Sequence, residues 1–240
     1  SIERRNLQTR SAKAYQLDLR STNMQRADLE NAEFENARLE GSHLDGAILT
    51  GSRLNGANMK GTWLVDCKLD HADLEGVDLT KANLTNAILR GSNLCQSKLV
   101  NTNLPYAVLA NAQVDNAALI QANLRFARLN GANLSDASLV GSDLGGVYFG
   151  NAILDRALLI GAKIDNKTSI GVASVKSTAV RSINFAHSDI TQYQANSAFG
   201  DHTTRLPPKI EPPEWKSQKF DNDGAFYEAW RAHKAAHNIP

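Results

Sequence analysis

The sequence predicts an all-β fold in which the chain winds into a four-sided β-helix. Three observations predict it. Every fifth residue from Leu19 to Ile164 is large and apolar, and 24 of these 30 positions are Leu. A small residue, most often Ala, stands two positions before each of them from Ala27 to Ala162. Two positions after each large residue, from Asn31 to Asn166, Gly or Asn fills 19 of the 28 places.

The small and the large residue of each unit are separated by one residue, which is the alternation of a short β-strand with both side chains inward. A helix is excluded because a 3.6-residue period would spread a five-residue stripe over all its sides. Gly and Asn accept positive φ readily, as the third residue of a type II turn requires. The chain is therefore expected to turn a corner every five residues, and four corners close a coil of twenty residues.

The repeating unit resembles the A(D/N)LxX repeat of the pentapeptide-repeat family. The runs that carry this resemblance are Ala27-Asp28-Leu29, Ala72-Asp73-Leu74, Ala82-Asn83-Leu84, Ala122-Asn123-Leu124 and Ala132-Asn133-Leu134. The resemblance covers about three-fifths of the chain and implies a right-handed quadrilateral β-helix (a pentapeptide-repeat solenoid).

The repeat region is expected to span residues 19–190 with one break in register. After Ile164 the pattern slips by one residue within 165–169 and resumes at Ile170. Ile183 then occupies a place that is otherwise small, which predicts distorted last coils.

Both ends are expected to carry caps, because an open β-helix exposes unpaired backbone. Residues 1–18, with Leu7, Tyr15 and Leu17, are predicted to cover the first coil. Residues 191–240 are predicted to form a C-terminal arm and a capping helix.

Within this tail, 199–216 contains four prolines and is predicted to be extended. A short α-helix is expected after the N-capping residues 221–223, with Phe226 and Trp230 on one face. The tail is similar to that of some bacterial members of the family. In such relatives a membrane-spanning region can precede the repeats, so the chain is also interpreted as a fragment.

Because Leu fills the interior, function is expected on the outer walls or the ends. One outward column is aliphatic in four successive coils, which makes a larger apolar patch than the isolated hydrophobic residues that are normal on a surface. Its residues are Val100, Ile120, Val140 and Ile160, with Leu158 beside them. The preferred interpretation is that the C-terminal arm and helix cover this column. The alternative is a partner or homodimer surface.

A second candidate patch combines aromatic and aliphatic residues with an arginine, a composition that is typical of protein interfaces. Its residues are Ile88, Tyr106, Val108, Phe126, Arg128 and Tyr148. Scattered apolar residues on a tolerant wall would produce the same pattern, and both interpretations stay open.

Charge is unevenly distributed along the repeats. Residues 19–80 hold 6 Lys/Arg against 11 Asp/Glu, and residues 81–164 hold 7 against 4. Family members that mimic DNA would need a strongly negative rod. The repeat region totals only −2 from these counts, so a solvated acidic face is the preferred interpretation. The absence of a continuous basic stripe also disfavours direct nucleic-acid binding.

The sequence offers little for catalysis, and no cofactor is predicted. His233 and His237 are spaced to share a metal on a helix, but no third ligand is apparent, so no metal site is assigned. Cys67 occupies an inward small-residue position and is expected to be inert. Cys95 points outward with no evident base beside it, which disfavours a reactive role.

The sequence therefore predicts a non-catalytic interaction scaffold that binds an unidentified protein, with a homodimer as one form of this. The alternative function is a DNA-mimicking modulator of a type II topoisomerase such as gyrase. No stretch is long and apolar enough to span a bilayer. A reducing cytoplasm is expected, since two cysteines are too few for a disulfide framework. The alternative location is the soluble part of a larger, membrane-tethered protein.

Overall fold

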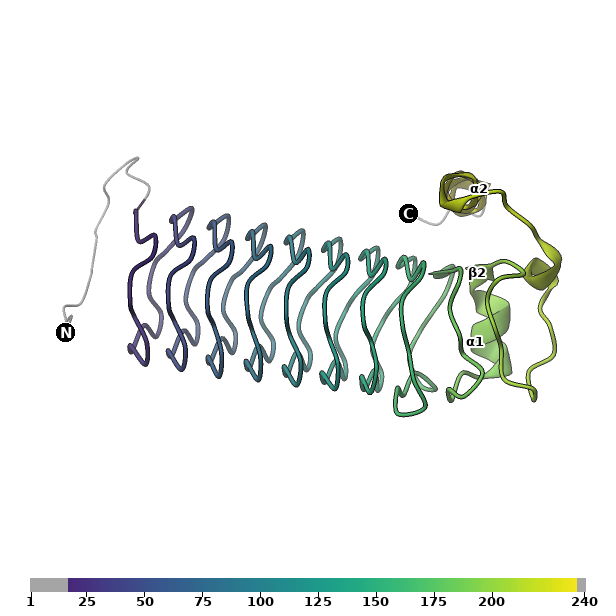
Figure 1. Ribbon diagram of the computed structural model, residues 1–240, viewed down its shortest axis with the longest axis horizontal. Helices are drawn as coiled ribbons and strands as arrows, with labels where there is room; N and C mark the ends of the chain where they lie inside the picture. Colours follow the sequence, from purple (N-terminus) through teal and green to yellow (C-terminus); the bar gives the residue numbers. More distant parts are fainter. Residues whose placement is uncertain (1–16, 237–240) are drawn as a thin grey trace.

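In the computed structural model, which describes residues 17–236, the chain winds as a straight stack of four-sided coils (Figure 1). Residues twenty apart form parallel bridges, so that Asn83 pairs with Trp63 on one side and Asn103 on the other. The Leu64 amide donates to the Asn83 carbonyl over 2.7 Å, and the Asn83 amide donates to the Thr62 carbonyl over 2.9 Å. The predicted all-β helix is thereby confirmed. The predicted cap residues Leu7 and Tyr15, and also His237, lie outside the described residues.

The corners are β-turns whose third residue has positive φ. This residue recurs at every fifth position from Ser21 (φ 53°) to Gly161 (φ 65°). The Thr62 amide closes one such turn by donating to the Met59 carbonyl over 3.2 Å. Gly and Asn dominate these positions because the left-handed region costs them little.

The inward residues fill the coil completely. Leu64, Leu84 and Leu104 have no exposed surface, and neither do most of their small neighbours. Where the small residue is Thr, its hydroxyl can still be satisfied, since Thr62 donates to the Leu39 carbonyl over 3.0 Å. The rod therefore has a solid Leu-rich core along its axis.

We name the coils by number, coil 1 being residues 17–36, coil 2 being 37–56, and so on. We name the four walls A, B, C and D after their central residues in coil 4, which are Asp78, Asn83, Ile88 and Asn93. A column is the set of residues that occupy the same place on a wall in successive coils, twenty residues apart.

The coil lengthens by one residue where the sequence pattern slips. Asp143 pairs with Lys163 twenty positions on, whereas Tyr148 pairs with Ser169 at twenty-one. The extra residue is held by Asp165, whose carboxylate accepts the Gly146 amide over 2.9 Å and the Lys167 amide over 2.9 Å. Burial raises the pKa of the Asp165 carboxyl, but the hydrogen bonds from these backbone amides lower it by more, so the net shift is downward.

The coil continues irregularly beyond residue 190. Strand β1 (Ala179–Val180) pairs in parallel with β2 (Phe199–Gly200), and Asn184 pairs with Arg205. The prediction of a non-repetitive extended arm over 199–216 is therefore wrong in part, since Phe199–Gly200 and Arg205 pair with the preceding coil. A short helix, α1 (Gln192–Ser197), precedes β2 in the last coil. The 3-10 helix η1 (Glu214–Ser217) packs Trp215 against the C-terminal end of the core.

The last helix, α2 (Asp223–Ala236), begins where the Asn222 side chain accepts the Ala225 amide over 2.9 Å. It lies across the outside of the stack and not over its open end (Figure 1). In the part of the chain that the structure describes, no helix is long and apolar enough to cross a membrane.

Candidate functional site: the outer walls

Helix α2 covers the C-terminal part of wall A. Phe226 and Trp230 are buried against Ile160, Ala179 and Phe199, with Val140, Leu158, Phe220 and Ala229 packed around them. The aliphatic column is therefore covered at Val140 and Ile160. Val100 and Ile120, in the same column, remain half-buried outside this cluster. The expected cover is thus present over two of the four column residues.

Three polar contacts fix α2 in this place. The Trp230 indole donates to the Ser177 carbonyl over 2.7 Å. Lys234 binds the Asp136 carboxylate over 2.8 Å. Arg181 binds Asp223 over 2.8 Å. Because these contacts are spread along the helix, both of its ends are held to the coils.

Arg181 also binds Asp201 over 2.6 Å, and Asp201 is fully buried while Arg181 is 7% exposed. Its guanidinium lies 5.5 Å from the centre of the Phe226 ring. A single buried arginine therefore joins the last coil to α2. The sequence carried no signal for this pair beyond two opposite charges in an irregular region.

A cavity of about 610 Å³ lies between α1, η1 and α2. Phe199, Trp215 and His233 contribute rings to its lining, and Glu211 and Glu214 contribute carboxylates. Its lining residues all belong to the C-terminal part of the chain, from Gln192 to His233.

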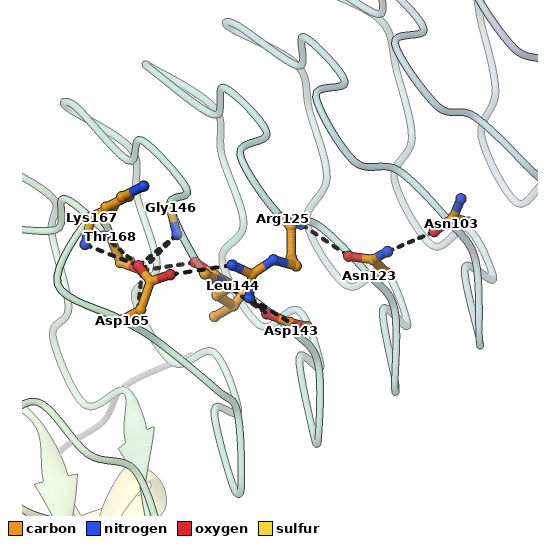
Figure 2. Close-up of polar contacts among 10 residues, drawn as sticks. Asn103, Asn123, Arg125, Asp143, Leu144, Gly146, Asp165, Lys167 and Thr168 are labelled. Atoms are coloured by element: carbon orange, nitrogen blue, oxygen red, sulfur yellow. Dashed lines mark hydrogen bonds and ion pairs between the residues drawn. The ribbon is translucent and has the colours of Figure 1, made fainter.

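Wall B carries a ladder of amide side chains that ends in an ion-pair cluster (Figure 2). Asn123 donates to Asn103 over 2.7 Å, and the Asn123 carboxamide oxygen accepts the Arg125 amide over 3.2 Å. Arg125 then binds Asp143 over 3.3 Å and Asp165 over 3.4 Å. These polar groups satisfy one another, so this wall presents a hydrogen-bonded surface and not a reactive one.

The second predicted patch lies on wall C and on the corner between walls B and C. The Tyr106 and Phe126 rings stack at 5.3 Å with an interplanar angle of 12°. Tyr106 is 56% exposed and Tyr148 is 45% exposed. Arg128 is also exposed, and the described residues supply it with no ion-pair partner. Ile88 and Val108 are half-buried in the same column as Arg128.

Bulky aromatic residues are unusual at these corners. Tyr106 has φ 61° and Phe126 has φ 59°, where the repeat favours Gly or Asn. The Phe126 ring lies against the backbone of Gly146, where a side chain would clash with it. Two cations lie over the Phe126 ring, with the Arg125 guanidinium 5.3 Å and the Lys167 ammonium 5.7 Å from its centre. The coil imposes this conformation on every corner, so what distinguishes Tyr106 and Phe126 is the bulk of their rings at positions where Gly or Asn would be less strained.

A hollow of about 830 Å³ lies on the same corner nearer the N-terminal end of the rod. It is lined by Asn23, Gln25, Arg26, Asp45, Gly46, Ile48, Val65 and Asp66. Gly46 stands at the corner position that Tyr106 occupies three coils later, and the Arg26 side chain lies beside it. No sequence pattern had singled out this place.

The two cysteines have unreactive surroundings. Burial raises the pKa of the Cys67 thiol to about 12. Burial, followed by the hydrogen bond to Asp115, raises the pKa of Cys95 to about 12 as well. The expectation of no base beside Cys95 is wrong, since the Asp115 carboxylate lies 2.9 Å away, but its charge opposes thiolate formation. Across residues 17–236, no three His, Cys, Asp or Glu residues lie close enough to hold a metal ion.

Solved structures of known proteins resemble this chain. HetL, a pentapeptide repeat protein involved in heterocyst differentiation regulation in the cyanobacterium Nostoc sp. strain PCC 7120, is 28% identical. The match covers 82% of this chain and 91% of HetL, with a TM-score of 0.59.

Two further structures match more loosely. Rfr23, a pentapeptide repeat protein from the cyanobacterium Cyanothece 51142, is 36% identical over 43% of this chain and 64% of its own, with a TM-score of 0.32. QnrB1, a plasmid-mediated fluoroquinolone resistance protein, is 16% identical over 80% of this chain and 91% of its own, with a TM-score of 0.38. No curated protein sequence matches the chain.

Two family profiles match the repeats. The "Pentapeptide repeat region" profile matches residues 27–104. The "Pentapeptide repeats (8 copies)" profile matches overlapping segments from residue 87 to 166. Together with the four-sided coil and the HetL likeness, these matches show that the chain belongs to the pentapeptide-repeat family and is a right-handed quadrilateral β-helix.

Proposed function

We propose that this chain is a non-catalytic protein-interaction scaffold that binds a protein partner through the outer walls or ends of its β-helix. The inward side chains are buried and fill the coils, so the chemistry available to a partner is that of the walls. Flat parallel ladders present rows of side chains at fixed spacing, which suits recognition of another surface.

The observation that carries this proposal is the exposed patch on wall C and its corner. Tyr106 and Tyr148 are about half exposed, and within residues 17–236 Arg128 has no ion-pair partner and no segment covers these residues as α2 covers wall A. Tyr and Arg are the residues that most often supply binding energy in protein interfaces. Tyr106 and Phe126 also stand at corner positions that Asn or Gly would occupy with less strain.

The alternative, a DNA-mimicking modulator of a type II topoisomerase, has weaker support. The acidic half of the rod neutralises part of its own charge, with Arg53 2.8 Å from Glu35 and Lys60 3.3 Å from Asp78. A DNA mimic needs unpaired negative charge at phosphate-like spacing. We expect no effect of micromolar protein on gyrase supercoiling, and inhibition or protection of gyrase would favour the alternative.

Affinity capture from nuclease-treated lysate of the source cell tests the scaffold. Wild-type protein should retain a protein partner, and Arg128→Glu or Tyr106→Asn should lose it. Lys98→Glu, which makes the same charge change on wall A, should retain it. If all four proteins captured the partner equally, or if none captured a partner, the proposal that wall C binds a protein would be contradicted.

The free thiols of Cys67 and Cys95 support a reducing compartment such as the cytoplasm.

A further inference from the structure

We propose that wall C binds wall C of a second copy of this chain, with the two rods antiparallel and a two-fold axis between coils 3 and 4. This deepens the proposed function, on which it rests, by naming one partner. The outward residues of coils 1–6 change in character along the wall in a self-complementary way.

The geometry follows from the straight stack (Figure 1). A two-fold axis that lies in the plane of the wall and crosses the rod reverses the order of the coils and keeps each column opposite itself. Coil 1 of one copy then faces coil 6 of the other, coil 2 faces coil 5, and coil 3 faces coil 4. The ~4.8 Å spacing of parallel ladders is the same in both copies, so all six coils stay in step.

Charges are complementary in this register. In the central column Asp28 faces Arg128, and neither residue has an ion-pair partner among the residues that the structure describes. In the next column Asp70 faces Arg90, which already lie 3.6 Å apart within one chain. The axis therefore joins two such pairs into a cluster of four alternating charges. An isologous contact repeats each of these pairs twice.

Apolar groups are complementary in the same register. Ile48 faces Val108, and both are half-buried in the isolated chain. Ile88 faces Lys68, whose aliphatic stem can lie over it while the ammonium reaches solvent. Outward residues of wall C in coils 4–7, within 86–91, 106–111, 126–131 and 146–151, include no Asp or Glu that would be buried against these groups.

Shape is complementary at the corner between walls B and C. Tyr106, the most exposed residue of the patch, faces Gly46 and the hollow of about 830 Å³ around it. Phe126 faces Arg26, which lines the same hollow and can stack its guanidinium on the ring. The strained aromatic corner and the side-chain-free corner thus become the two halves of one contact.

At the opposite corner, between walls C and D, the facing pairs are Asn31 with Gly131, Gly51 with Asn111, and His71 with Gly91. Within one chain the side chains of Asn31, His71 and Asn111 already lie over Gly51, Gly91 and Gly131, so this corner adds no further shape complementarity. No pair in any of these columns brings like charges together.

The contact is narrow, with six coils giving a length of about 29 Å at the spacing of parallel strands. We therefore expect a reversible dimer with a dissociation constant on the order of micromolar. Sedimentation equilibrium of the full chain from 1 to 100 µM, at low and at high salt, measures it directly. The expected result for the wild type is a dimer mass at the upper concentrations, weakened by salt because charge pairs contribute.

A charge swap tests the register. Arg128→Glu and Asp28→Arg should each weaken the dimer by roughly tenfold or more, and the double variant should restore it. Lys98→Glu on wall A should leave the mass unchanged, and circular dichroism checks that each variant keeps its coils.

A monomeric wild type, a dimer that survives Arg128→Glu, a double variant that stays monomeric, or nucleic acid bound through Arg128 would each overturn the proposal. A monomer whose wall C still captures a different protein would overturn the dimer and leave the scaffold function standing.

Discussion

At the scale of the residue, each position in the five-residue unit is decided by one physical requirement. The large residue must fill the axis of the coil, so Leu84 and its equivalents from Phe34 to Leu159 are buried. The small residue must leave room for that Leu, and the corner residue must accept positive φ. These requirements repeat at every unit, which is why the core and the corners could be predicted residue by residue from the sequence.

The small inward position provides a matched pair of serines for a stability test. Ser52 and Ser92 are both fully buried, but the Ser92 hydroxyl donates to the Leu89 carbonyl over 2.9 Å, whereas the Ser52 hydroxyl has no partner among the described residues. A buried hydroxyl without a partner costs free energy that removal recovers. Ser52→Ala should raise the free energy of unfolding by about 1 kcal/mol.

Ser92→Ala should lower the free energy of unfolding by a similar amount, because it removes a hydrogen bond that is made. Urea unfolding of the two variants beside the wild type measures both changes. Equal effects of the two substitutions would show that the hydroxyl at residue 52 finds a partner after all.

At the scale of the element, the departures from the repeat were harder to predict. The slip after Ile164 was visible in the spacing, but its cause was not, because Asp165 acts through backbone amides that the sequence does not display. Helix α1 was missed although Thr191 and Gln194 form a capping box, a recognisable signal that the expected repeat at 190 obscured. Helix α2 was predicted from its caps and its apolar face, and its place on wall A required the structure.

The docking of α2 should depend on pH through Asp136. Burial raises the pKa of this carboxyl, but hydrogen bonds from Arg156 and Lys234 outweigh burial, so its pKa in the folded state lies below the ordinary value. A carboxyl with a depressed pKa stabilises the fold above its unfolded pKa, near 4, and this contribution is lost as pH falls through the folded value. Asp136→Asn should therefore be destabilising at pH 6.

The difference in unfolding free energy between wild type and Asp136→Asn should shrink at pH 3, because this lies below the ordinary carboxyl pKa near 4 and the unfolded wild type has then taken up the proton. Urea unfolding at the two pH values measures this difference. A difference that is the same at pH 6 and pH 3 would contradict a role for the ionised carboxylate in holding α2.

At the scale of the whole molecule, the fold restricts where function can lie. The repeat fixes a solid rod, so a partner meets only walls, corners and ends. The sequence singled out both wall patches by sorting residues into columns of twenty. It could not show that α2 covers Val140 and Ile160 and leaves wall C open, because this depends on where an irregular tail docks. The hollow at Gly46 could not be predicted either, since its lining combines residues from three successive coils.

Site-directed cross-linking tests most directly whether wall C of one copy binds wall C of another. In a Cys95→Ser background, Ile48→Cys and Val108→Cys are combined in one chain and treated with a short thiol-reactive cross-linker. The two thiols of one chain lie three coils apart, so the proposed contact predicts efficient covalent dimers that join residue 48 of one copy to residue 108 of the other. The controls, Ile48→Cys alone and Val108→Cys alone, should give few dimers, because each residue lies three coils, about 14 Å along the rod, from its own equivalent across the contact. Monomer alone, or dimer yields from the single variants that equal the yield of the double variant, would contradict the contact.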